Sequence, residues 1–307
     1  MFTEKLLKVL ITGATGFTGS FVVTRMLEQG NAKIRCFVRP QSDLSSLPKD
    51  QIELAYGDLN QPETLRQALL GIDILVNLAS LGFGHAPQIV AATQAAGVKR
   101  AIFMSTTAIF TTLNAASKHV RVAAEATIQS SSLDYTILRP TMIYGNKRDR
   151  NMVRLINYLQ RWPVIPVFGR GTHLQQPVYV DDLARAVVRI IDEPRTFRQN
   201  YNLPGQMALT YNQVISTICH QLQRKVYRLH MPTQPVIRLL LLVERFGLRP
   251  PLKAEQIMRL NEDKAFDYSE ASRDFDYQPL SFSEGIRQEM LSLGLYPNPM
   301  NEQSHVR

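Results

Sequence analysis

The sequence contains little cysteine, little histidine and no long apolar run, and each shortage excludes a class of protein. Its two cysteines, Cys36 and Cys219, lie inside apolar segments, which predicts buried thiols in a reducing compartment rather than a disulfide or a metal pair. The six histidines show no metal-ligand spacing, so we expect no metal site. Because no stretch of about 18 apolar residues occurs, no membrane-spanning helix is expected.

The N-terminus and the charge balance exclude further classes of protein. Residues 1–5 lead almost directly into an apolar strand, which leaves no room for a signal peptide and predicts a cytoplasmic protein. The formal net charge is +9, from 35 basic and 26 acidic residues. No long lysine run or aromatic RNA-binding motif accompanies this charge, so we expect no nucleic-acid partner. We interpret the basic surface as favourable to an anionic cofactor and substrate, with an anionic membrane surface as the alternative.

The most informative segment runs from Lys8 to Gly19, where a short apolar strand ends in three glycines spaced three apart. Gly13 permits a tight turn, Gly16 lets the backbone approach a pyrophosphate, and Gly19 lets the following helix pack close to the strand. The N–H groups and the dipole at the start of that helix favour negative charge. The segment therefore predicts a dinucleotide site, and the alternative is a glycine-rich turn that binds nothing.

Apolar runs of strand length alternate with helical patterns through the first half of the chain. This rhythm predicts an α/β fold, a doubly wound parallel sheet of the Rossmann type, with a smaller and mostly helical C-terminal lobe. We assign residues 1–150 to the dinucleotide-binding core, residues 151–300 to a substrate or cap lobe interleaved with the core's last strands, and residues 301–307 to a frayed tail. The expected strands are Val9–Thr12, Ile34–Val38, Ile52–Tyr56, Ile74–Asn77, Ala101–Ser105 and Tyr135–Leu138, and the expected helices are Ser20–Glu28, Glu63–Leu70, Gln88–Ala96 and Ala115–Gln129.

Polar residues follow the second and third strands, at the sheet edge where such folds bind ligands. Arg39 closes the second strand, where an acidic residue would accept hydrogen bonds from the adenosine ribose. An arginine there can pair with a 2′-phosphate, which favours NADP(H) over NAD(H); a solvated arginine is the alternative. Asp58, followed by Leu59, can accept from the adenine amino group.

Two further segments follow the fourth and fifth strands. Leu78, Ala79 and Ser80 are expected to pass close under the cofactor. The segment Ser105-Thr106-Thr107 would turn hydroxyls toward the nicotinamide and the substrate. The alternative for these hydroxyls is the capping of a helix or turn.

Together these features resemble the short-chain dehydrogenase/reductase superfamily in its extended or atypical form, and are similar to its NAD-dependent epimerase/dehydratase branch. Residues 138–145 (LRPTMIYG) look like the family's segment after the sixth strand, and residues 176–184 (QPVYVDDLA) resemble its HVDDLA segment, with Tyr179 where histidine is usual. The resemblance covers about residues 7–290 and implies an NAD(P)-binding oxidoreductase, or an epimerase or dehydratase, for a small or nucleotide-linked substrate. The cofactor-binding residues that it implies are Gly13, Thr15, Gly16, Phe17, Thr18, Arg39, Asp58, Leu59, Leu78, Ala79, Ser80, Lys118, Pro140 and Ile143.

The chain departs from the family at one catalytic position. Family members use a Ser or Thr together with Tyr-x-x-x-Lys, in which the lysine binds the nicotinamide ribose and lowers the pKa of the tyrosine. By this resemblance Thr107 and Lys118 are the catalytic residues here, and Asn114 stands at the tyrosine position. A carboxamide neither gives nor takes a proton near pH 7, so the family's proton donor is missing.

Three interpretations of this departure stay open. Lys118 itself, once desolvated, acts as the acid or base. Alternatively, Tyr144 or the substrate supplies the proton. In the third interpretation the chain binds the dinucleotide without turnover, which resembles the nitrogen-regulator-like sensors and the short-chain-type accessory subunit of respiratory complex I.

Other residues border the expected pocket for a small-molecule substrate. Those that the resemblance places near the substrate are His85, Arg139, Tyr144 and Tyr179, and a solvated loop histidine is the alternative for His85. We interpret the apolar segment 235–246 as a cap helix over the substrate. A peripheral membrane contact, with Arg238 and Arg245 near lipid phosphates, is its alternative. The sequence is also compatible with a homodimer.

Overall fold

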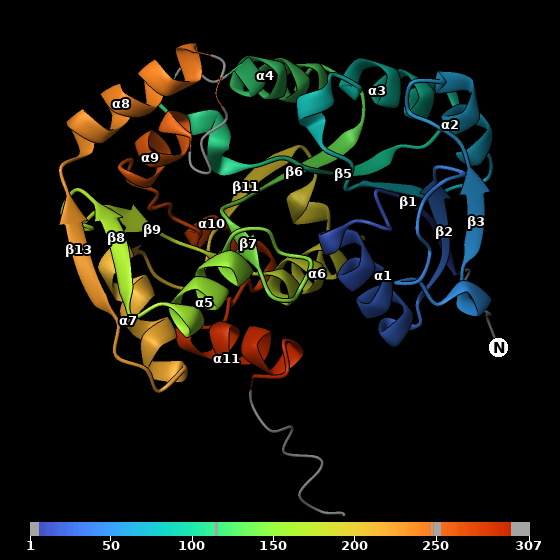
Figure 1. The fold of residues 1–307 in the computed structure, drawn as a ribbon. Helices are drawn as coiled ribbons and strands as arrows, with labels where there is room; N and C mark the ends of the chain where they lie inside the picture. Colours follow the sequence, from blue (N-terminus) through green and yellow to red (C-terminus); the bar gives the residue numbers. More distant parts are fainter. Residues whose placement is uncertain (1–5, 114–115, 247, 249–252, 296–307) are drawn as a thin grey trace, which may run out of the picture. The chain divides into compact units, whose positions relative to one another are not determined.

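The computed structural model describes residues 6–113, 116–246, 248 and 253–295, and it divides into two compact units (Figure 1). Unit 1 is drawn from residues 1–141, 180–203 and 267–278. Unit 2 is drawn from residues 142–179, 204–266 and 279–307. Each unit is therefore assembled from three separate segments of the chain.

Unit 1 is built on a seven-stranded sheet in the order β11-β6-β5-β4-β1-β2-β3, with every neighbouring pair parallel. The strand order reverses direction at β1 and β4, which is the switch point where ligands of such sheets bind. Both β4 and β5 are buried throughout, as expected for central strands covered on two faces. The strands are β1 (Leu7–Thr12), β2 (Ala32–Val38), β3 (Glu53–Tyr56), β4 (Ile74–Asn77), β5 (Arg100–Met104), β6 (Asp134–Pro140) and β11 (Gln199–Leu203).

Helices cover both faces of this sheet (Figure 1). On one face α1 (Phe17–Gln29) packs against α6 (Val180–Arg189), and Arg25 of α1 forms a bidentate ion pair with Asp181 of α6 through two contacts of 2.6 Å. The other face carries α2, α3 and α4 in a row, which bury a core of apolar side chains against the strands. These helices are α2 (Pro62–Ala68), α3 (Ala86–Ala95) and α4 (Ala116–Gln129). The doubly wound parallel sheet predicted from the alternating pattern is confirmed.

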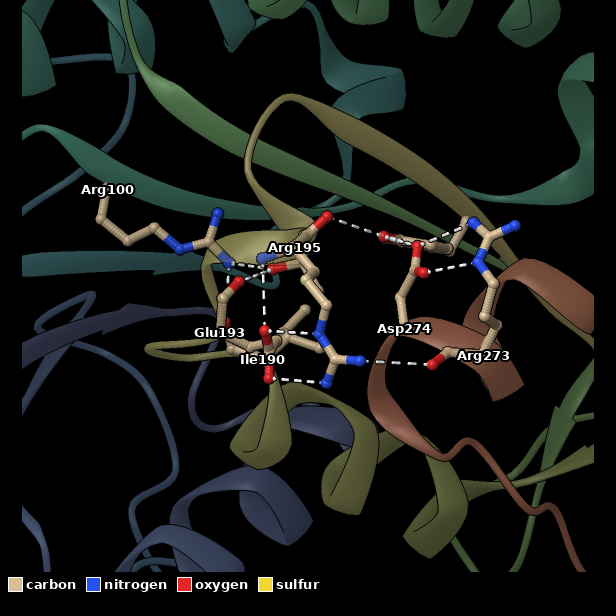
Figure 2. Close-up of polar contacts among 8 residues, drawn as sticks. Arg100, Ile190, Glu193, Arg195, Arg273 and Asp274 are labelled. Atoms are coloured by element: carbon tan, nitrogen blue, oxygen red, sulfur yellow. Dashed lines mark hydrogen bonds and ion pairs between the residues drawn. The ribbon is translucent and has the colours of Figure 1, made fainter.

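A buried arginine holds the amino end of the sheet together (Figure 2). Arg100, the first residue of β5, donates hydrogen bonds to the carbonyl oxygens of Asp134 (2.8 Å) and Ile190 (2.7 Å) and to the hydroxyl of Thr196 (3.0 Å). Its guanidinium also lies 4.5 Å from the centre of the Phe197 ring. Burial lowers the pKa of Arg100 to about 10. One side chain thereby links β5, β6 and the segment that follows α6, at the end of the sheet opposite the ligand-binding edge.

The same end of unit 1 is completed by α10 (Ser269–Phe275), which packs against β11. The Tyr201 hydroxyl on β11 donates a 2.7 Å hydrogen bond to the carboxylate of Asp274 on α10. Figure 2 shows this carboxylate paired with Arg273, and Arg195 paired with Glu193. The last segment of unit 1 is therefore anchored to the sheet by a buried tyrosine.

Unit 2 contains three two-stranded pairs and five helices in the part of the chain that the structure describes. Two pairs are parallel, β7 with β10 and β8 with β13, and β9 with β12 is antiparallel. Its buried core joins α5, α7 and α11 through residues such as Ile156, Ile218 and Ile286. The expectation of a smaller, mostly helical lobe is confirmed. The elements are β7 (Ile143–Tyr144), α5 (Met152–Arg161), β8 (Val164–Phe168), β9 (Leu174–Gln175), β10 (Val178–Tyr179), β12 (Leu209–Thr210), α7 (Tyr211–Gln221), β13 (Tyr227–Met231), α8 (Thr233–Arg245), α9 (Ala254–Leu260) and α11 (Phe282–Ser292).

One carboxyl group lies inside the core of unit 2. Glu289 on α11 is 0% exposed and interacts with the carboxyl group of Asp149 and the backbone of Gly145. Burial, together with the nearby carboxylate of Asp149, raises the pKa of Glu289 to about 9. Asp149 itself accepts hydrogen bonds from backbone N–H groups at the start of α5, including that of Met152 at 2.7 Å. Glu289 is therefore protonated at neutral pH.

Both cysteines are free and buried, as the sequence predicts. Burial raises the pKa of the Cys36 thiol to about 12, so this group is unreactive at neutral pH. None of the helices in the described residues has both the length and the apolar character needed to cross a bilayer.

Candidate functional site

The glycine turn after β1 is packed so tightly that no side chain fits at its first position. Gly13 has a φ of +69°, and a Cβ placed there would lie 2.8 Å from the backbone nitrogen of Ala79, which follows β4. The Gly16 N–H donates a 2.9 Å hydrogen bond back to the Gly13 carbonyl and closes the turn. The turn is therefore pressed against the neighbouring strand at the switch point of the sheet.

Helix α1 begins immediately after this turn, and its N-terminus has no side-chain cap. Gly16 is the N-cap residue, and the first turn of the helix, which starts at Phe17, carries no acidic residue. The positive end of the helix dipole is consequently not neutralised by the helix's own side chains. This combination of a glycine cradle and an uncapped helix start fits the pyrophosphate of a dinucleotide.

A buried pair of polar side chains supports the segment beside the turn. The Thr12 hydroxyl donates to the Asn77 side-chain oxygen (2.7 Å), and the Asn77 amide donates to the Ala79 carbonyl (3.1 Å). Leu78 and Ala79 are half-buried and Ser80 is exposed, with its hydroxyl accepting from the N–H of the residue two positions on. The predicted Leu78–Ser80 segment thus lies against the glycine turn.

Three charged or titratable side chains follow β2, β3 and β4. Arg39 is exposed directly after β2, and Asp58 follows β3. The N–H and amide of Asn60, 2.8 and 2.9 Å from the Asp58 carboxylate, lower its pKa, and the charges of Arg39 and His85 lower it further. The structure therefore brings Arg39, Asp58 and His85 into one electrostatic neighbourhood. Leu59, beside Asp58, packs against the core.

The hydroxyls after β5 differ in accessibility. The Thr107 hydroxyl is buried and donates to the Pro140 carbonyl at the end of β6 (3.2 Å). The neighbouring Thr106 is half-buried and accepts from the N–H of Ala108, as the cap of a short 3-10 helix over Thr107–Phe110. The sequence analysis places Thr106 in the segment whose hydroxyls face the nicotinamide or cap a turn, and in the structure its hydroxyl is such a cap.

Lys118 lies near the start of α4, and its ammonium group donates a 2.6 Å hydrogen bond to the Thr111 carbonyl. The side chain is half-buried. Asn114, at the position of the family's tyrosine, lies outside the described residues. The Lys118 ammonium group therefore already has a protein partner, in the segment that precedes its helix.

A buried network lies behind the end of β5. The Glu125 carboxylate on α4 accepts from the Ser105 hydroxyl (2.5 Å) and from the Arg139 guanidinium (2.6 Å). The Arg139 guanidinium also lies 5.4 Å from the centre of the Phe110 ring. The predicted substrate residue Arg139 is thus engaged in an internal ion pair. Sequence reasoning misses Glu125, because its partners come from two distant segments.

The remaining predicted residues belong to unit 2. Tyr144 is 1% exposed, and its ring centre lies 5.8 Å from that of Tyr179 and 5.5 Å from that of Phe282. Its hydroxyl occupies the space that a side chain at Gly285 would need. Ile143, the first residue of β7, is half-buried. The predicted pocket residues are therefore distributed over both units.

Sequence and structure comparisons agree with this geometry. A family model described as NAD(P)H-binding matches residues 13–194, so the chain belongs to this NAD(P)H-binding family. The chain is 28% identical to the photosystem II assembly factor Ycf39 of Trieres chinensis over 70% of this chain and 69% of that protein. It is 27% identical to a ceramide reductase of Caulobacter vibrioides over 77% of each chain.

A solved structure of similar fold is the UDP-glucose 4-epimerase of Thermotoga maritima. It superposes with a TM-score of 0.73 at 16% identity, over 94% of this chain and 99% of that one. The resemblance to the epimerase/dehydratase fold of the short-chain dehydrogenase/reductase superfamily, predicted from the motifs, is confirmed at the level of the fold.

Proposed function

We propose that this chain is an NADP(H)-dependent oxidoreductase that acts on a small or nucleotide-linked substrate. The observation that carries the cofactor preference is Arg39, an exposed guanidinium directly after β2, where NAD-preferring sites place a carboxylate. A guanidinium at this position matches the charge and geometry of a 2′-phosphate.

Several groups of the chain would hold the cofactor. The N–H groups of Phe17 and Thr18, in the first turn of α1, would bind the pyrophosphate. The Asp58 carboxylate would accept a hydrogen bond from the adenine amino group, and Arg39 would pair with the 2′-phosphate. Bound NADPH supplies a hydride donor. The fit rests on the glycine cradle, which a Cβ at Gly13 would fill, and on the uncapped start of α1.

Replacing Arg39 by alanine is expected to weaken NADPH binding about tenfold and to change NADH binding less than about twofold, because only NADPH carries the phosphate. Fluorescence titration of the pure protein with each nucleotide measures both affinities. Lys33→Ala, an exposed cation at the opposite end of β2, is the matched control and should leave both affinities unchanged. Tighter NADH than NADPH binding by the unmodified protein, or an unchanged NADPH affinity in Arg39→Ala, would contradict the assignment.

Lys118 is the group that we propose for ribose binding and proton transfer. Reduction of a carbonyl requires a proton for its oxygen, and an ammonium can donate one where Asn114 cannot. The Thr106 and Thr107 hydroxyls are proposed to orient the substrate oxygen. In this proposal the Lys118 ammonium exchanges its hydrogen bond to the Thr111 carbonyl for one to the ribose or substrate.

A second candidate function is NADP(H) binding without turnover, as in an assembly or sensor protein. It is favoured by the Lys118 ammonium, which is already bound to Thr111, and by the Thr107 hydroxyl, which is turned to Pro140. The role of the Ycf39 relative, assembly of photosystem II, is compatible with this alternative.

The two candidates differ in hydride transfer. We expect deuterium from C4-labelled NADPH to appear in a carbonyl substrate from a chemically diverse panel, and Lys118→Met to reduce this transfer at least about a hundredfold. Asn114→Ala should retain it, and Lys99→Met serves as a control for a remote lysine. Transfer that is unaffected in Lys118→Met would exclude the proposed role. Intact NADPH binding with no transfer to any carbonyl class would favour the second candidate.

A further inference from the structure

Helix α8 exposes apolar side chains on the side that faces away from its own unit. Leu239 is 60% exposed, Leu242 51% and Phe246, at the C-cap, 74%. Their spacing of three and four residues places them on one stripe of the helix, together with the exposed Pro235. Solvent-facing helix surfaces are normally polar, so this stripe is an apolar face that no other part of the described chain covers.

The stripe is not the face by which α8 packs in unit 2. Ile237 is buried against Ala254 and Ile257 of α9, and Val236 and Leu240 pack on the same cluster. At 100° per residue, Ile237 and Leu240 lie roughly opposite to Leu242. Packing with α9 therefore accounts for one side of α8 and leaves the stripe without a role in the unit's core.

The charges on α8 are arranged asymmetrically. Arg238 and Arg245, seven residues apart and both exposed, lie along one border of the stripe. The single acidic residue of the helix, Glu244, is half-buried and accepts a 3.0 Å hydrogen bond from the N–H of Ala254. Leu241, 48% exposed, lies on the other side of these arginines, so the outer surface of α8 is apolar with two cationic side chains along it.

We propose that α8 docks on an anionic lipid bilayer, with Leu239, Leu242 and Phe246 among the acyl chains and Arg238 and Arg245 at the phosphates. The helix has 13 residues, which suits a position along the interface and is too short for a span. Arginines beside an apolar stripe complement the negative charge of phospholipid headgroups, and the chain's net charge of +9 acts in the same direction. This surface is distinct from the residues assigned to the cofactor and does not depend on the proposed oxidoreductase activity.

A second copy of the chain fits this surface less well. The exposed side chains of the stripe offer roughly 100 Å² each, about 400 Å² in total, whereas a standard dimer interface covers about 800 Å² on each partner. A symmetric pairing along the stripe would also bring the cationic borders of two helices together, while the single carboxylate of α8, Glu244, is half-buried and bound to Ala254.

The test is co-sedimentation of the full chain with vesicles of phosphatidylcholine alone or mixed with phosphatidylglycerol. We expect the unmodified chain to bind the mixed vesicles. When Leu239, Leu242 and Phe246 are all changed to serine, we expect the affinity to fall at least about tenfold. The matched control changes Leu70, Val122 and Met207, three exposed apolar residues outside α8, to serine and should bind within about twofold of the unmodified chain. Arg238→Gln combined with Arg245→Gln should weaken binding to mixed vesicles about tenfold, whereas Lys33→Gln with Lys49→Gln should not.

NADPH titration of every variant verifies that unit 1 remains folded, and circular dichroism verifies that the helices are retained. The proposal is overturned if the unmodified chain binds neither kind of vesicle, or if the triple α8 variant binds as well as its control. It is also overturned if sedimentation velocity shows a dimer that the triple α8 variant converts to a monomer, because the stripe would then serve a second copy. Loss of oxidoreductase activity alone would bear only on the proposed function.

Discussion

Replacing Glu289 by glutamine is expected to raise the free energy of unfolding by about 3 kcal/mol at pH 8 and to change it by less than about 1 kcal/mol at pH 5. The folded-state pKa of about 9 lies far above the ordinary value of 4.5 because the carboxyl group is buried beside that of Asp149. Between these two values the unfolded chain loses a proton that the folded chain keeps. Stability is therefore greatest below about pH 4.5 with respect to this group and falls as the pH rises toward 9.

Glutamine removes this dependence because its amide does not ionise. Urea unfolding of both proteins between pH 5 and pH 8 measures the difference. Glu270→Gln, an exposed carboxylate on α10, is the control and should shift the free energy of unfolding by less than about 0.5 kcal/mol at either pH. Equal stability losses between pH 5 and pH 8 in the Glu289→Gln variant and the unmodified protein would show that Glu289 is not held protonated.

Changing Gly19 to alanine is expected to cost about 3 kcal/mol of stability and to weaken NADPH binding more than about tenfold. A Cβ at this position would lie 2.7 Å from the Ala14 carbonyl oxygen, 2.8 Å from the Ala14 Cα, and well inside the van der Waals surface of the Gly13 carbonyl oxygen. All of these atoms are backbone, so relief requires a shift of the turn itself. A displaced turn moves the N–H groups that would face the pyrophosphate.

The control for this variant lies at the other end of the same helix. Gly30 has a φ of +69°, and no atom of the described residues lies within 4 Å of the position that a Cβ would take there, so Gly30→Ala carries backbone strain without a clash. We expect it to cost about 1 kcal/mol and to leave NADPH affinity unchanged. Thermal unfolding and nucleotide titration of both variants separate the two effects. A Gly19→Ala protein as stable and as tight-binding as Gly30→Ala would show that the close approach at Gly19 is unimportant.

The sheet is largely predictable because its central strands are short apolar runs bounded by turn residues. The expected strand Ile74–Asn77 coincides with β4, and Val9–Thr12 differs from β1 by two residues at its start. The sequence prediction omits β11, because Gln199–Leu203 contains only two apolar residues, Tyr201 and Leu203, and lies at the edge of the sheet. An edge strand is stabilised largely by pairing with its neighbour, and the hydrophobicity of its own residues does not predict that pairing.

The candidate site is predictable where function depends on local backbone. The glycine turn can be inferred because tight turns and close helix packing demand glycine at set spacings. The partners of Glu125 cannot be inferred in this way, because Ser105 and Arg139 are 20 and 14 residues away from it in the sequence. The outward face of α8 cannot be inferred from the sequence either, because apolar residues occur on nearly every side of the helix. Only its packing with α9 shows which of these residues are buried and which are exposed.

The assembly of unit 1 from three segments has a consequence for its biosynthesis. The six strands from β1 to β6 leave the ribosome early, but β11 comes later and the segment with Asp274, the acceptor for the Tyr201 hydroxyl, comes later still. Unit 1 therefore cannot be completed until translation has passed residue 278 of 307. By then most of the unit 2 segments have also been synthesised. Unit 1 therefore cannot finish folding before α10 is made, at a time when much of unit 2 has already left the ribosome.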